Sequence, residues 1–195
     1  MFSFSRPTPL ILEKQLMRAR TLPLSYAQAI ESRAGLEGVH APAGFAMDHT
    51  RSEIGRGAGA FEAAKLALRQ WLHFDLGWVR VANPDVAIEI GQMVAVEAHA
   101  LGLWSLNLSR ILYMIDEPER FGFGYGTTAM HVERGEERFL VEFDRESEAV
   151  YYDLLAVSRP AHWLAMLGYP YTRSRQRRFA RESHRRMRTL VGCLS

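Results

Sequence analysis

The sequence predicts an α+β fold in which a curved antiparallel sheet of about six or seven strands grips a long C-terminal helix. The main observation is a change of apolar period. Residues 61–72 repeat at helical spacing, whereas residues 78–158 alternate with a period of two. No connection within 78–158 is long enough for a crossover helix, so an antiparallel meander is expected. We expect residues 1–43 to form a helical N-terminal leader that packs on a single domain, residues 44–195.

The leader contains one clear helix signal. Pro9 suits the first turn of a helix, which would run to about Arg20 and stop before Pro23. Glycines and prolines between residues 35 and 44 then predict a loop. We expect this region to wrap over the main domain rather than to fold alone.

A strand followed by an amphipathic helix opens the main domain. The strand is expected over residues 45–54, and the apolar face of the helix consists of Phe61, Ala64, Leu68, Trp71 and Leu72. The segment between them, GRGAG at 55–59, precedes a helix as a phosphate-binding loop would. It lacks the Lys-Ser/Thr pair of a P-loop and the spacing of a dinucleotide fingerprint, so we interpret it as a tight turn and predict no cofactor.

The remaining strands are predicted over residues 78–82, 86–90, 93–100, 104–116, 120–128, 138–144 and 149–158. A helix should begin near residue 161, break or kink at Gly168 and Pro170, and resume to about residue 191. The space between a curved sheet and a helix on one of its faces suits an apolar ligand. The leading functional prediction is therefore binding of a small, mostly apolar molecule, lipid-like or aromatic, in that cavity.

Residues 120–127, RFGFGYGT, alternate aromatic residues with glycine. Side chains of successive strand residues point to opposite faces, so one face carries the aromatic residues and the other is bare backbone. Glycine weakens a strand, and three in alternation predict that a helix, a neighbouring strand or a ligand packs closely against the bare face.

Five segments carry a resemblance to a known family. They are GRGAGAFEAAKLALRQW (55–71), GLWSLNLSRILYMIDE (102–117), RFGFGYGT (120–127), HVERGEERFLVEF (131–143) and SRPAHWLAMLGYPYTRSRQRRFARES (158–183). The chain resembles a bacterial and plant family described as a domain of unknown function and numbered nineteen-ninety. Its element order is similar to that of the helix-grip superfamily, which includes START lipid-transfer domains, polyketide cyclases and birch-pollen-allergen-like proteins. This resemblance implies an apolar cavity and no particular activity.

Candidate ligand-binding residues lie on the predicted strands. They are Arg110, Tyr113, Phe121, Phe123, Tyr125, Thr127, Tyr152 and Arg159. A guanidinium that faces a cavity can bind a carboxylate or phosphate headgroup through two parallel hydrogen bonds. On a solvated face the same arginines would instead pair with Asp116, Glu142 or Asp153, and the aromatic residues are more often ordinary core.

An enzyme is the alternative interpretation, and it depends on residues 131–137, HVERGEE, which we expect to form a turn. A neutral imidazole beside carboxylates can act as a general base or bind a metal. The spacing fits no defined metal motif, and glutamates are ordinary in exposed turns, so no metal is predicted. The catalytic residues of this cyclase, hydrolase or isomerase would be His131 and Glu133.

The charge distribution leaves a third possibility open. Residues Arg173–Arg188 contain eight arginines and one glutamate, and the rest of the chain has 16 basic and 21 acidic residues. Such a helix can bind nucleic acid or an anionic surface. It can equally neutralise an acidic body, and the one aromatic residue among these arginines, Phe179, does not make a platform on which bases would stack.

Composition limits the class of protein. The longest charge-free stretch near the middle, residues 98–109, is too short to span a membrane, and the N-terminal apolar run is too short for a signal-peptide core. A single cysteine, Cys193, allows no intrachain disulfide. A reducing, cytoplasmic location is therefore expected.

Overall fold

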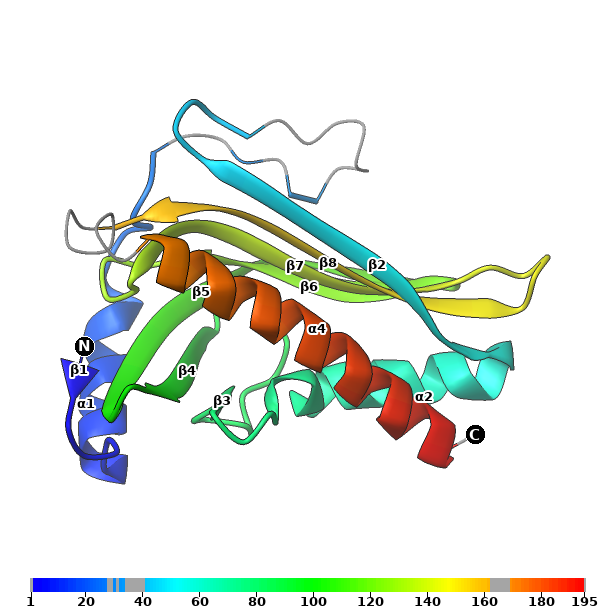
Figure 1. Ribbon diagram of the computed structural model, residues 1–195, viewed down its shortest axis with the longest axis horizontal. Coiled ribbons are helices and arrows are strands. Elements are labelled where there is room, and N and C mark those ends of the chain that lie inside the picture. Colours follow the sequence, from blue (N-terminus) through cyan, green and yellow to red (C-terminus); the bar gives the residue numbers. More distant parts are fainter. Residues whose placement is uncertain (1, 28–29, 31, 34–40, 162–168, 195) are drawn as a thin grey trace.

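The computed structural model of the chain describes residues 2–27, 30, 32–33, 41–161 and 169–194 (Figure 1). Its elements are β1 (Phe2–Ser3), α1 (Pro9–Arg20), β2 (Ala46–Arg56), α2 (Gly57–Arg69), the 3-10 turn η2 (Leu72–Phe74), β3 (Val79–Val81), β4 (Met93–Ala100), β5 (Leu103–Glu117), β6 (Arg120–Thr127), β7 (Glu133–Phe143), β8 (Ala149–Pro160) and α4 (Tyr169–Leu194). The order of strand, helix, meander and C-terminal helix follows the sequence prediction.

In the described part of the chain, one antiparallel 8-stranded sheet has the order β2-β8-β7-β6-β5-β4-β3, and β1 pairs with β5 off this path. The first long strand, β2, therefore lies beside the last, β8. The sheet curls, and α4 runs across one of its faces (Figure 1). The predicted α+β fold with a curved sheet and a long C-terminal helix is confirmed.

Two helices cover the face of the sheet that we call the inner face. Alanines at 60, 63, 64 and 67 are buried on α2, and such small side chains allow the helix to lie close to the strands. Towards its C-terminal end α4 contributes Met187 and Val191 to the same core. Gly55 at the end of β2 makes this approach possible, because a Cβ there would lie 2.5 Å from Cγ1 of Val191.

Part of the leader covers the opposite, outer face. Thr8 caps α1 by accepting a hydrogen bond from the Ile11 amide, and Pro9 occupies the first turn, as predicted. Leu12, Leu16 and Ala19 of α1 pack against β4 and β5. Further along, Ile30 is buried against β8. Both faces of the sheet therefore carry a packed layer.

One predicted strand, residues 86–90, is wrong. This segment is irregular, because the side chain of Asn83 takes the place of a strand partner beside β4. Its amide group donates to the Met93 carbonyl and accepts from the Ala95 amide, both at 2.9 Å. The following residues turn back instead, and the Val86 carbonyl accepts a hydrogen bond from the Trp71 indole.

The predicted turn at residues 131–137 is also wrong in part. Glu133 to Glu137 belong to β7 and pair with β8, and Glu136 and Glu137 also pair with β6. The many charged residues conceal a regular alternation, which continues into Phe139 and Val141. The helix expected to begin at residue 161 falls largely on residues 162–168, which lie outside the described residues. In the described ranges no helix is both long enough and apolar enough to cross a membrane.

Candidate functional site: a pocket between the sheet and α4

A pocket of about 1050 Å³ lies between the inner face of the sheet and the N-terminal half of α4. Small-molecule sites typically have about 300–1,000 Å³, so its size suits a metabolite or a lipid chain. Apolar residues of the sheet, η2 and α4 form much of its wall: Phe74, Trp78, Val79, Val96, Ala98, Leu154, Ala156 and Phe179. Four side chains that we call the polar wall interrupt this surface: Tyr125, His131, Glu133 and Glu137.

The alternation of β7 places two carboxyl groups in the polar wall. Glu133 and Glu137 line the pocket, and Phe139 continues the same face into the inner core. Glu136 and Arg138 point the other way and are buried at the outer face. A one-residue shift of register would exchange the two sets, so the pairing with β6 and β8 fixes which carboxyls reach the pocket.

Helix α4 supports Glu133. The side-chain amide of Gln176 donates to both carboxylate oxygens, at 2.8 and 2.9 Å, and Arg173 donates to the Gln176 oxygen at 2.9 Å. Arg173 also pairs with Asp48 of β2. Burial and the nearby charge of Glu137 raise the pKa of Glu133 to about 7, against the opposing effects of Gln176 and Arg173. Glu133 can therefore give or take a proton near neutral pH.

Glu137 has a neutral partner. The Tyr125 hydroxyl donates to its Oε2 at 2.6 Å. Burial raises the pKa of Glu137, although this hydrogen bond acts in the opposite direction. Burial and the Glu137 charge raise the pKa of Tyr125 well above its usual range, so Tyr125 remains a hydrogen-bond donor.

His131 is a neutral ring in this environment. The backbone amide of Glu133 donates to its Nδ1 at 3.0 Å, which places the ring proton on Nε2. Burial lowers the pKa of His131 to about 4. This hydrogen bond involves the backbone of Glu133 and not its carboxyl group. Acid and base roles for His131 and Glu133, which both line the pocket, stay a prediction.

The pocket brings together three of the predicted site residues, Tyr125, His131 and Glu133. Three other predicted residues, Phe121, Phe123 and Tyr152, are buried in the inner core beside it. The Tyr152 hydroxyl lies 3.0 Å from Ser183 Oγ of α4.

Four other predicted site residues also do not line the pocket: Arg110, Tyr113, Thr127 and Arg159. Arg110 donates to the Leu22 carbonyl just beyond α1, at 2.6 Å, and Arg159 lies over the ring of Phe45. Thr127 accepts a hydrogen bond from the Gly135 amide. Tyr113 lies at the outer face because the pairing of β5 with β6 shifts between Ile111 and Tyr113.

Tyr113 also explains why one face of β6 carries glycine residues. A Cβ on Gly124 would lie 2.2 Å from the Tyr113 ring, and one on Gly126 would lie 2.5 Å from the Tyr26 hydroxyl. The close partners of the predicted glycine face are therefore a neighbouring strand and the leader.

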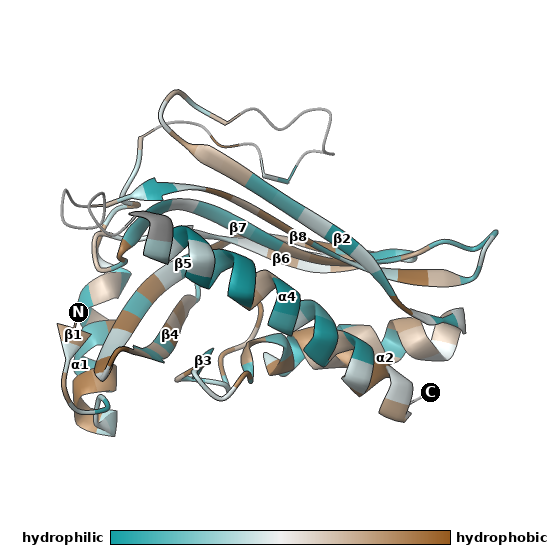
Figure 2. Ribbon diagram, in the orientation of Figure 1, coloured by the Kyte–Doolittle hydropathy of each residue, from teal (hydrophilic) through white to brown (hydrophobic). Residues whose placement is uncertain are grey.

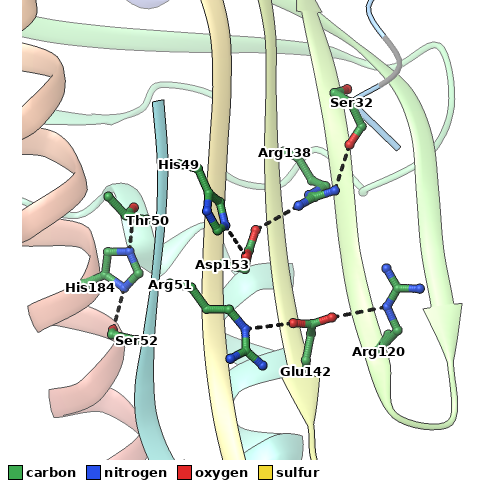
Figure 3. Close-up of polar contacts among 10 residues, drawn as sticks. All are labelled: Ser32, His49, Thr50, Arg51, Ser52, Arg120, Arg138, Glu142, Asp153 and His184. Carbon is green, nitrogen blue, oxygen red and sulfur yellow. Dashed lines mark hydrogen bonds and ion pairs between the residues drawn. The ribbon is translucent and has the colours of Figure 1, made fainter. Parts of the chain in front are cut away.

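A second polar cluster, which we call the outer network, joins the leader to the outer face (Figure 3). Arg138 donates to the Ser32 carbonyl and to Asp153 Oδ1, both at 3.0 Å, and His49 lies 2.6 Å from Asp153 Oδ2. Ser32 also donates to Glu136. Each carboxyl group of this network is hydrogen-bonded, and the leader covers it.

His184 positions α4 on β2. Its ring nitrogens lie 2.9 Å from Thr50 Oγ1 and 2.8 Å from Ser52 Oγ (Figure 3). Burial lowers the pKa of His184, which favours the neutral ring. Together with the Asp48–Arg173 pair, this contact sets the distance between helix and sheet and therefore the width of the pocket.

Many α4 arginines have partners within the protein, and hydrophilic residues make up much of the helix (Figure 2). Besides Arg173, these are Arg175 over the Trp78 ring and bonded to the His99 carbonyl, Arg178 with Glu182, Arg186 with Asp75, and Arg188 with the Glu53 carbonyl. Arg177, Arg181 and Arg185 are exposed. Arg173 and Arg186 therefore pair with acidic residues of the body, whereas Arg178 pairs with Glu182 of α4 itself.

Sequence reasoning missed Glu137 and Gln176 as pocket residues. The signal for Glu137 was present, since Glu133, Gly135 and Glu137 lie two residues apart in line with Phe139 and Val141. Gln176 lies three residues before Phe179 on α4, and both line the pocket. The three-residue spacing of Gln176 and Phe179 is visible in the sequence, but it is a weak signal of a shared helix face among so many arginines. Among the described residues, no three His, Cys, Asp or Glu are grouped so that they could hold a metal ion.

The curled antiparallel sheet, the long C-terminal helix and the pocket between them define a helix-grip protein. A crystal structure of Ara h 8.0201 shares this fold, with a TM-score of 0.51 at 12% identity over 76% of this chain and 98% of that one. A hypothetical protein from Helicobacter pylori has the same TM-score of 0.51 at 12% identity, over 87% of this chain and 98% of that one.

The chain belongs to the family described as domain of unknown function DUF1990, which matches residues 26–186. A UPF0548 protein of Dictyostelium discoideum is 34% identical over 98% of this chain and 96% of its own length. One from Deinococcus radiodurans is 34% identical over 99% of this chain and all of its own, and one from Arabidopsis thaliana is 37% identical over 72% and 70%. The family therefore occurs in eukaryotes as well as bacteria.

Proposed function

We propose that this protein binds a small, mostly apolar molecule in the pocket between the sheet and α4. The observation that carries the proposal is the pocket itself, with a volume of about 1050 Å³ and a wall made largely of apolar side chains. An empty apolar pocket of this size forgoes both dispersion contacts and removal of apolar surface from water, and a ligand restores both. The polar wall would orient the ligand and contribute specificity.

The test is displacement of Nile red by decanol. It compares the wild type with two variants in which one alanine is replaced by phenylalanine. Ala98 is a pocket-lining residue of β4 that remains partly exposed, so Ala98→Phe should fill space and lower decanol affinity at least about tenfold through lost apolar contact. Ala58→Phe makes the same chemical change at an exposed site on α2 and should leave affinity unchanged. Thermal unfolding of each variant verifies folding. Equal decanol affinity in the wild type and a folded Ala98→Phe would contradict the proposal.

Catalysis is a second candidate, favoured by one observation: Glu133 lines the pocket with a pKa of about 7. It would act as the proton donor or acceptor in a cyclase-, hydrolase- or isomerase-type reaction, while the neutral His131 donates a hydrogen bond through Nε2. Once a co-purifying ligand is identified, turnover by the wild type and by Glu133→Gln distinguishes the candidates. A carrier binds with either residue and converts nothing, whereas an enzyme loses turnover in the variant.

Two further predictions carry over from the sequence. The exposed Arg177, Arg181 and Arg185 keep binding of nucleic acid or an anionic surface as a proposal, and retention on heparin at low salt, lost in the triple Gln variant, would support it. The free, exposed Cys193 is consistent with the proposed reducing, cytoplasmic location.

A further inference from the structure

We propose that the pocket selects an amphipathic molecule whose polar end is a cation, an amine or ammonium group, held between Glu133 and Glu137. This inference rests on the proposed function, because it names the chemical class of the ligand for the same pocket. The pocket is defined by the sheet and α4 as a whole, and the two carboxyl groups lie in its wall.

The donors that the structure shows on these carboxyl groups are neutral. Gln176 donates an amide hydrogen to Glu133, and Tyr125 donates a hydroxyl hydrogen to Glu137. A carboxylate has about four lone-pair sites, so each group retains acceptor capacity on its pocket side. A cation entering the pocket would add charge-assisted hydrogen bonds, which are roughly twice as strong as neutral ones.

Glu136 on the outer face, by contrast, has a hydrogen-bond donor on each of its carboxylate oxygens. It accepts hydrogen bonds from Tyr26 at 2.7 Å and from Ser32, and the leader covers it. Its neighbours Arg138 and Asp153 neutralise each other. The protein thus provides partners for the carboxyl groups of the outer face, while it leaves those of the pocket with neutral donors and open space.

Charged groups around the polar wall come from every layer that packs against it. On the sheet they are Glu133 and Glu137 of β7 and Asp48 of β2, with the neutral Tyr125 of β6 and His131 before β7. On α4, Arg173 pairs with Asp48, and Arg175 stacks on Trp78. Arg177 and Arg181 also line the pocket but are exposed, where solvent and salt screen their charge.

The experiment compares three probes that share a decyl chain: decylamine, decanol and decanoate, each titrated calorimetrically below its micelle concentration. One charge-assisted hydrogen bond is worth about tenfold or more in affinity, so decylamine should bind about tenfold tighter than decanol, and decanoate weakest. The preference for decylamine should grow as pH rises from about 6 to about 8, because Glu133, whose pKa is about 7, ionises over this range.

Variants assign the preference to the polar wall. Glu133→Gln and Glu137→Gln should each bring the affinity for decylamine towards the affinity that the same variant has for decanol. Glu62→Gln removes one negative charge at an exposed position on α2 and should preserve the preference. The pH dependence should disappear in Glu133→Gln.

The outcomes separate this inference from the proposed function. Decanol binding with no preference for decylamine, or a preference for decanoate, overturns the cationic class but retains an apolar pocket. A preference that survives in the double variant Glu133→Gln/Glu137→Gln overturns the assignment to these residues. Failure of all three probes to bind overturns the proposed function and this inference together.

Discussion

The two faces of strand β7 carry similar charged residues in different surroundings. On the outer face, Glu136 and Arg138 are sealed under the leader, and each has partners of opposite charge or hydrogen-bonding character. On the inner face, the hydrogen-bond donors that the structure shows on Glu133 and Glu137 are neutral, although the charge of Arg173 also acts on Glu133, and both carboxyl groups border a pocket. The comparison indicates that the outer network holds the fold together and that the inner carboxyl groups are available to a ligand.

The largest expected effect comes from breaking the outer network. Arg138→Met leaves Asp153 buried with His49 as its remaining partner, and removing one member of a buried ion pair typically costs about 3–5 kcal/mol of unfolding free energy. Urea unfolding measures this cost. Glu137→Gln on the inner face is the matched comparison and should change stability by less than about 1 kcal/mol, since Tyr125 can still donate to the amide oxygen.

The double variant Arg138→Met/Asp153→Leu sharpens this test. Replacing both members of a buried pair by apolar residues is often neutral or stabilising, so most of the lost stability should return. A single Arg138→Met variant as stable as wild type would show that the outer network does not hold the leader and the sheet together.

A smaller effect is expected at the glycine face of β6. Gly124→Ala places a Cβ within 2.2–2.5 Å of the Tyr113 ring, and overpacking of this kind costs about 1–3 kcal/mol. Gly59→Ala on α2 is the control: no atom lies within 4 Å of its added Cβ, and helix propensity should stabilise it by about 0.5–1 kcal/mol. Thermal melts of the two variants should therefore shift in opposite directions, and a raised melting temperature for Gly124→Ala would contradict the packing.

The smallest effect near neutral pH concerns His73, a titratable group with neither a charged nor a hydrogen-bonding partner among the described residues. It is fully buried among aromatic rings, neither ring nitrogen has a hydrogen bond among the described residues, and burial lowers its pKa to about 3. The unfolded chain takes up this proton below about pH 6.5 and the folded protein does not. Stability is therefore complete above pH 6.5 and falls by about 1.4 kcal/mol for each pH unit below it, down to about pH 3.

The variant His73→Leu isolates this contribution. The unfolding free energy of the wild type relative to the variant should fall by about 1.4 kcal/mol from pH 7.5 to 5.5, because the other titrating groups are common to both proteins. Parallel profiles would mean that the pKa of His73 is the same in the folded and unfolded protein. His99→Leu, at an exposed position, serves as a control for a general effect of the substitution.

The comparison also explains how much could be read from the sequence. Period-two alternation and short connections are local properties, so the meander and the helices beside it followed from the sequence. The burial of Phe121 and Phe123 in the inner core rather than in the pocket wall did not, because alternation gives the face of a strand and not the position of a pocket along it. Tyr125 was predicted to face the cavity by the same alternation and lines it. The position of Tyr113 was not predictable, because it depends on a register shift within β5 that no residue pattern announces.

The polar wall was predictable only in part for a related reason. Residues 131–137 carry so many charges that the sequence predicts an exposed turn. Their burial in the structure depends on partners that are distant in the sequence. Gln176 of α4 lies 43 residues from Glu133, and Ser32 of the leader lies 104 residues from Glu136. Long-range contacts of this kind decide whether a charged strand faces solvent, a protein partner or a ligand.

Native mass spectrometry of the freshly purified protein tests the central claim most directly. The wild type and Ala58→Phe should carry an added mass that is lost on denaturation, and Ala98→Phe, purified in parallel, should carry little or none. The same adduct at the same occupancy in Ala98→Phe would place the bound molecule outside the pocket between the sheet and α4 and would contradict the account.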